Sequence, residues 1–74
     1  MTDIYVLVGC PAEARGDWRR NAEAWLRARY PDANSITTDT NGAPGTRVLT
    51  AWLGAARTKA PGLLDALLEA VPLP

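Results

Sequence analysis

The spacing of hydrophobic and polar positions changes several times along the chain, and each change marks a new element. Residues 4–8 form an unbroken apolar run rich in β-branched side chains, which ends at Gly9 and Pro11. A run without alternation is typical of a strand that is buried on both faces inside a parallel sheet. Because the chain predicts at most one further strand, we expect this strand to leave an open edge that must be covered or paired.

A helical period follows this strand. Its apolar positions recur four, seven and eight residues apart and therefore share one helical face; they are Trp18, Ala22, Trp25 and Leu26, followed by Arg29 and Tyr30. We expect Asp17 to cap the N-terminus of the helix and Pro31 to end it. On the outer face, Arg19, Glu23 and Arg27 are spaced four apart, which favours ion pairs within the helix.

The second half of the chain predicts a weak strand and two more helices. Residues 35–40 are threonine-rich and moderately strand-like, and residues 41–45 form a loop. Thr46 is placed to cap a helix that the Pro-Gly pair at residues 61–62 ends. The apolar stripe of that helix consists of Val48, Leu49, Trp52, Leu53 and Ala56, and that of the last helix, ending at Pro72, consists of Leu63, Leu64, Leu67, Leu68 and Val71.

These patterns together predict a small α/β fold. We expect a single domain over residues 1–74, with one buried N-terminal strand, a possible second short strand and three helices. A chain of this length forms a thin core and often needs support from a partner or from its own copies.

Composition narrows the classes of function. Eight Lys and Arg residues balance eight Asp and Glu residues among 74, so the net charge is zero. Proteins that bind nucleic acid or anionic membranes normally carry a basic excess, so neither partner is expected. The absence of His excludes Ser-His-Asp and Cys-His catalysis and His-ligated zinc within one chain, and we expect no catalytic residue, cofactor or metal. One Cys, with no signal-peptide or membrane-spanning pattern, favours the cytoplasm.

The junction between the first strand and the first helix is the best candidate for a binding site. It runs from Gly9 through Cys10 and Pro11 to Arg15, Gly16 and Asp17. A buried parallel strand that turns into a helix points backbone N–H groups at whatever lies above the turn, which is the geometry used to bind phosphates.

This segment, VLVGCPAEARGDW, resembles the start of P-loop kinases of the polynucleotide-kinase kind, in which a strand runs into G-C-P-G-S-G-K-S-T-W. The likeness covers roughly the first 40 residues, and the stretch SITTD is similar to the one carrying that family's catalytic Asp, which would place it at Asp39. The resemblance implies a phosphate or nucleotide bound by Gly9, Arg15, Gly16, Asp17 and Asp39. In that fold, the first two strands in sequence are not neighbours in the sheet.

The departures from the family pattern argue against catalysis. Ala14 replaces the second loop glycine, Arg15 replaces the phosphate-binding Lys, and Gly16 replaces the Ser or Thr that binds Mg²⁺. Glycine cannot offer a hydroxyl to a metal, and a planar guanidinium is no substitute for a compact ammonium. The alternative function for this turn is therefore binding of a phosphate or nucleotide without catalysis.

Cys10 and Arg15 suggest a second comparison. Their Cys-x4-Arg spacing is one residue shorter than the Cys-x5-Arg loop of tyrosine phosphatases, and a loop shortened by one residue would not close the same cradle. A helix N-terminus and Arg15 could lower the pKa of the thiol. The favoured interpretation is a small buried residue that follows a core strand.

The aromatic and leucine-rich positions predict an association surface. A domain of this size rarely buries three indoles completely, so we expect at least one at an interface. The predicted surface consists of Trp18, Trp25, Trp52, Leu64, Leu67, Leu68 and Val71. The sequence therefore predicts a non-catalytic interaction or assembly module that is oligomeric or part of a larger complex, as in a virus or mobile element, with itself or another protein as partner.

Overall fold

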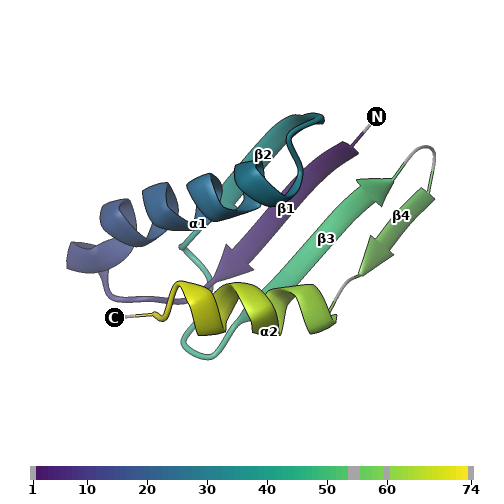
Figure 1. Ribbon diagram of the computed structural model, residues 1–74. Coiled ribbons are helices and arrows are strands. Elements are labelled where there is room, and N and C mark those ends of the chain that lie inside the picture. Colours follow the sequence, from purple (N-terminus) through teal and green to yellow (C-terminus); the bar gives the residue numbers. More distant parts are fainter. Residues whose placement is uncertain (1, 54–55, 60, 74) are drawn as a thin grey trace.

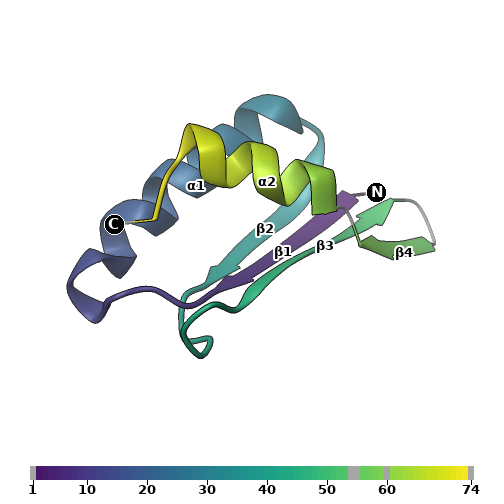
Figure 2. The same ribbon diagram turned by 90° about the horizontal axis from the view of Figure 1, so that it is seen from below.

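The computed structural model describes residues 2–53, 56–59 and 61–73, and the side chains of residues 2–50 and 62–73. It is an α/β structure in which one sheet is packed against a layer of two helices (Figures 1 and 2). The elements in chain order are β1 (Thr2–Val8), the single-turn 3-10 helix η1 (Ala12–Ala14), α1 (Arg15–Arg29), β2 (Ala33–Asp39), β3 (Arg47–Leu53), β4 (Ala56–Lys59) and α2 (Pro61–Ala70). Within these described ranges, no helix is both long and apolar enough to cross a lipid bilayer.

The sheet has four strands in the order β2-β1-β3-β4. Strands β1 and β2 are parallel and are joined by α1, whereas β3 is antiparallel to both β1 and β4. Strand β1 therefore has a hydrogen-bonded neighbour on each side. The predicted open edge of β1 is wrong, because β3 supplies the second neighbour that the sequence pattern did not indicate.

The predicted second helix, capped by Thr46, is also wrong. Residues 47–59 instead contain the β3–β4 hairpin, and Leu49 of β3 pairs with Val6 of β1. A short apolar run fits a buried strand as well as a helical stripe, and here the unpaired backbone groups of β1 favour the strand. The described ranges thus hold four strands and two α-helices where three helices and two strands were expected.

Both helices cover the same face of the sheet, which leaves the opposite face open (Figure 2). Along β1, Ile4, Val6 and Val8 are buried, whereas Tyr5 is exposed and Leu7 is half-buried. The prediction that this strand is buried on both faces is therefore wrong. Its continuous apolar run reflects a core face on one side and a partly apolar open face on the other.

The core lies between the sheet and the two helices. It joins side chains of β1, β2 and β3 to one stripe from each helix; its members are Ile4, Val6, Val8, Trp18, Ala22, Leu26, Ala33, Leu49, Leu64 and Leu67. The predicted apolar faces of the first and last helices are confirmed by this cluster. Strand β2 confirms the predicted short strand, beginning two residues earlier than expected.

The polar face of α1 differs from its prediction. The helix begins at Arg15, with Ala14 before it and no capping side chain, so Asp17 is not the N-cap and pairs instead with Arg20 in the first turn. The expected ion pairs on the outer face are replaced by bonds to β2. Arg19 Nε donates to Thr38 Oγ1 at 3.1 Å, and Thr38 Oγ1 donates to Glu23 Oε1 at 2.7 Å.

Candidate functional site

A cavity of about 400 Å³ lies at the carboxyl end of β1. Two loops form its walls, the one between β1 and η1 and the one between β2 and β3. Its lining residues are Gly9, Cys10, Pro11, Arg15, Gly42, Pro44 and Gly45. In open α/β sheets, ligands bind outside the carboxyl ends of parallel strands, and the parallel strands β1 and β2 both end at this edge of the sheet.

Gly9 is where the two loops cross. Its amide N–H donates to the carbonyl oxygen of Thr46 at 3.2 Å. The N–H of Thr46 in turn donates to the carbonyl oxygen of Ala43 at 2.9 Å. A side chain at Gly9 would overlap the Ala43 carbonyl oxygen, and its Cβ would lie 2.8 Å from the Gly42 oxygen. The glycine is therefore needed for close packing of the second loop, and its N–H is used within the chain.

Arg15 donates one hydrogen bond to each of the two loops that form the cavity wall. Its Nε donates to the carbonyl oxygen of Cys10 at 3.3 Å, and its Nη1 donates to Oδ1 of Asn41 at 3.0 Å. The backbone N–H of Asn41 in turn donates to Oδ1 of Asp39 at 2.9 Å. A guanidinium carries five N–H donors, so these bonds orient Arg15 while leaving donors that could bind a carboxylate or phosphate.

The structure brings together part of the predicted phosphate site. Gly9 and Arg15 line the cavity, and Asp39 is connected to them through Asn41. Gly16 instead lines a separate hollow on α1 with Arg19, and Asp17 is paired with Arg20. Cys10 is a free, half-buried cysteine in the cavity wall. Among the described residues, no cluster of three or more Cys, Asp and Glu side chains could hold a metal ion.

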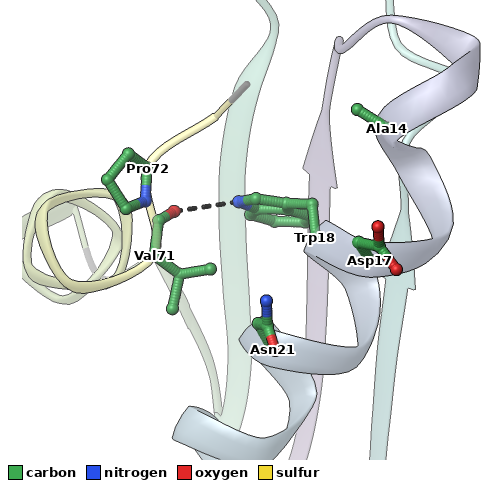
Figure 3. A pocket seen from close by; sticks show the side chains of 6 residues that line it. All are labelled: Ala14, Asp17, Trp18, Asn21, Val71 and Pro72. Atoms are coloured by element: carbon green, nitrogen blue, oxygen red, sulfur yellow. Dashed lines mark hydrogen bonds between the residues drawn. The ribbon is translucent and has the colours of Figure 1, made fainter.

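Another hollow, of about 220 Å³, lies where the start of α1 meets the end of α2 (Figure 3). The Trp18 indole lies at its base and donates from Nε1 to the Val71 carbonyl oxygen at 2.9 Å. Asp17, Asn21 and Pro72 form its rim. Because the indole N–H is already bonded within the chain, the polar side chains that line this hollow for a ligand are those of Asp17 and Asn21.

The predicted association residues divide into two groups. Trp18, Leu64 and Leu67 are buried in the chain's own core, which corrects their assignment to an association surface. Trp25, Leu68 and Val71 are half-buried and pack against that core. Trp52 pairs with Asp3 in the sheet, and its side chain lies outside the described part of the structure.

The open face of the sheet carries residues that the sequence did not single out. Tyr5 is 36% exposed, which is more than any other large hydrophobic side chain in the described part of the structure. It lies in the middle of β1, and its neighbours across the sheet are Thr37 of β2 and Thr50 of β3. The next pair along the strands, Leu7 with Val48, is half-buried on both sides. Thr50 is buried, so the accessible part of this partly apolar surface consists of Tyr5 and Thr37 together with Leu7 and Val48.

The Tyr5 hydroxyl is anchored. It donates a hydrogen bond of 3.3 Å to Oδ2 of Asp39. Partial burial of the ring, together with the nearby Asp39 carboxylate and this hydrogen bond, raises the pKa of Tyr5 above its ordinary value of 10.0. The bond holds the ring in place on the sheet, which lowers the entropy lost when a partner packs against it.

Comparisons with protein-family models, with curated proteins and with solved structures give no match to this chain. The polynucleotide-kinase resemblance therefore stays a prediction. The observed sheet order differs from that family, because β1 and β2 are neighbours here.

Proposed function

We propose that this protein is a non-catalytic interaction module whose contact surface is the open face of the sheet, centred on Tyr5, Leu7 and Val48. The exposure of Tyr5 in the middle of a central strand is the observation that carries this proposal. Aromatic side chains with an anchored polar end dominate the energetics of protein interfaces, and they are enriched there relative to the rest of the surface.

The zero net charge and the apolar character of this surface favour a protein partner. A small molecule requires a cavity, and the hollows described above are lined by residues of the loops and helices rather than by this face. Tyr5, Leu7 and Val48 would form the apolar centre of the contact, and the exposed Thr37 beside Tyr5 would form part of a polar rim, which is the usual arrangement of an interface.

Two variants separate the open face from the surface that the sequence predicts. Tyr5→Ser and Trp25→Ser each remove one partly exposed aromatic ring, the first from the sheet and the second from the helix layer. We expect Tyr5→Ser to lower the solution mass in light scattering, or to abolish retention of proteins from a host extract, while Trp25→Ser behaves as the wild type. Unchanged mass and unchanged retention in Tyr5→Ser would contradict the proposal.

A second candidate function is binding of a small anion in the cavity beside Arg15. It is favoured by the two hydrogen bonds that orient the guanidinium at the carboxyl end of β1. Inorganic phosphate, ATP with Mg²⁺, GTP with Mg²⁺ and a short single-stranded oligonucleotide are suitable probes in thermal unfolding. A ligand at about 100 times its dissociation constant stabilises by about 2.7 kcal/mol.

Arg15 also stabilises the loops, so the readout for this candidate must be the ligand-dependent shift in melting temperature. We expect Arg15→Ala to lower the melting temperature without ligand, because both loop contacts are lost. Arg20→Ala is the matched control, since Arg20 is an exposed residue of the same helix that does not line the cavity. Anion binding requires a stabilisation that Arg20→Ala retains and Arg15→Ala loses; absence of any shift in the wild type would exclude these four probes.

A further inference from the structure

The loop between β2 and β3 contains an asparagine that is followed directly by a glycine, Asn41 and Gly42. Asn41 is exposed, and its side-chain oxygen Oδ1 accepts the 3.0 Å hydrogen bond from Arg15 Nη1. Gly42 lines the cavity together with Arg15, and the hydrogen bonds among the described residues include none from its backbone N–H. The pair therefore combines an accessible side-chain amide with a neighbouring backbone nitrogen that no hydrogen bond holds.

From this arrangement we propose that Asn41 is a site of spontaneous deamidation, at which the chain converts its own asparagine into aspartate or isoaspartate. The Gly42 nitrogen, after losing its proton to the solvent, attacks Cγ of Asn41. The N–Cγ bond forms, the Cγ–Nδ2 bond breaks, and the nitrogen leaves as ammonia with a proton from water. Water then opens the resulting succinimide ring at either carbonyl carbon, so the overall reaction consumes water and releases ammonia.

The chain contains two other asparagines, and both are less suited to this reaction. All three are exposed, so exposure alone does not distinguish Asn21 and Asn34 from Asn41. Asn21 lies inside α1, where the helical hydrogen bonds hold the backbone nitrogens in place. Asn34 lies in β2 and is followed by Ser35, whose side chain hinders the attack. Gly42 has no Cβ and has the greatest backbone freedom, which favours ring closure at Asn41.

Arg15 assists the reaction from its place in the cavity wall. Negative charge develops on Oδ1 of Asn41 as the nitrogen attacks, and the Arg15 guanidinium already donates a hydrogen bond to that oxygen. A positioned cationic donor at a developing oxyanion stabilises the transition state. The second bond of Arg15, from Nε to the Cys10 carbonyl oxygen, keeps the guanidinium oriented. The fold thus supplies a stabilising group that the asparagine-glycine pair alone does not have.

Deamidation changes the charge of the cavity wall. The new carboxylate at position 41 lies beside Arg15, so a neutral hydrogen bond becomes a stronger, charge-assisted one. An anion must then displace this ion pair before it can bind Arg15, and the modification closes the anion site. This consequence rests on the second candidate function, whereas the modification itself does not. The isoaspartate form also lengthens the main chain of the loop that packs against Gly9.

Peptide mapping by mass spectrometry tests the site, because it assigns the loss of an amide to each asparagine separately. The folded chain is incubated at mildly alkaline pH for several times as long as the denaturant-unfolded chain needs to lose the Asn41 amide. We expect aspartate and isoaspartate to accumulate at Asn41 while Asn21 and Asn34 remain amides. Asn41→Gln is the matched control, since it keeps an amide but requires a larger ring, and should form no acidic species in ion-exchange chromatography. A folded chain that retains the Asn41 amide would overturn the inference, as would equal loss at all three asparagines.

Two further variants test the role of Arg15 and the consequence for the cavity. At a temperature where every variant is folded, we expect Arg15→Ala to lose the Asn41 amide more slowly than the wild type and Arg20→Ala to match the wild type. A loop merely loosened by the loss of Arg15 would lose the amide faster, so faster loss would overturn the assigned role.

Asn41→Asp reproduces one product of the reaction. We expect it to lose the phosphate-dependent rise in melting temperature that the wild type shows, and a retained rise would contradict closure of the anion site. A wild type that shows no rise with phosphate but still deamidates at Asn41 would remove this phosphate site and leave the modification standing.

Discussion

The indole Nε1–H of Trp18 donates a 2.9 Å hydrogen bond to the carbonyl oxygen of Val71, which lies 53 residues later in the chain. Trp18 is in the first turn of α1, and Val71 directly follows α2. A single contact thus ties the start of one helix to the end of the other (Figure 3). The same indole is 3% exposed, so it fills the core as well as joining the two helices.

Replacing Trp18 by Phe removes this hydrogen bond and part of the buried ring. We expect the free energy of unfolding to fall by about 1–3 kcal/mol in urea titrations. Trp25→Phe is the matched control, because Trp25 is half-buried and contacts Arg29 through its ring face at 5.4 Å. Its loss should stay below about 1 kcal/mol. Equal losses in the two variants would show that the Trp18–Val71 bond contributes nothing.

The loop crossing at Gly9 predicts an opposite response of two glycines to the same substitution. Gly9→Ala forces a side chain into the backbone of Ala43 and should lower stability by at least about 2 kcal/mol. Gly16→Ala meets no atom within 4 Å and lies in α1, so it should raise stability by up to about 1 kcal/mol. Thermal unfolding of both variants checks this. A tolerated Gly9→Ala would mean that the two loops do not pack as described.

The bonds between α1 and β2 predict a difference between adjacent threonines. Thr38 is buried and accepts from Arg19 while donating to Glu23, whereas Thr37 is exposed. We expect Thr38→Val to cost about 1 kcal/mol, because both partners lose their contact but can reach water. Thr37→Val should change stability by less than about 0.5 kcal/mol. Denaturant titrations that rank the two variants in the reverse order would contradict the assignment.

The raised pKa of Tyr5 predicts a loss of stability in alkali. Because the folded state holds the phenolic proton more tightly than the unfolded state, the contribution is fully present below pH 10.0 and is lost as the pH rises through the folded-state pKa. We expect Tyr5→Phe to lose less stability than the wild type in this window. An absorbance titration of tyrosinate should show a high-pH transition that Tyr5→Phe lacks; identical pH profiles would contradict the Asp39 contact.

The local patterns of the sequence predict four of the elements. Strand β1, both helices and the weak strand β2 follow from runs and periods that lie within a few residues of one another. The β3–β4 hairpin could not be predicted in this way. Residues 47–53 fit a helical stripe and a buried strand equally, and the choice depends on β1, which lies some forty residues away in the chain.

The candidate sites likewise combine contacts that are local in the sequence, which could be predicted, with contacts between distant residues, which could not. Gly9, Cys10 and Arg15 are close in sequence and lie together in the cavity wall, as the strand-to-helix turn predicts. Their partner Asn41 comes from the second loop, and no local pattern indicates that contact. Tyr5 could not be singled out from the sequence in this way, because it lies within the continuous apolar run of residues 4–8. Successive side chains of β1 face opposite sides of the sheet. The polar hydroxyl of Tyr5, between the apolar residues Ile4 and Val6, was the one feature of the run that could have indicated an open face.

The open sheet face is the central claim, and amide chemical shifts measure it most directly. Spectra of the ¹⁵N-labelled chain at increasing concentration should show shifts that grow at Tyr5, Leu7, Val48 and Thr50 and stay absent along the exposed side of α1. Tyr5→Ser should abolish them. Concentration-dependent shifts confined to Trp25, Leu68 and Val71 would place the contact on the helix layer and contradict the account.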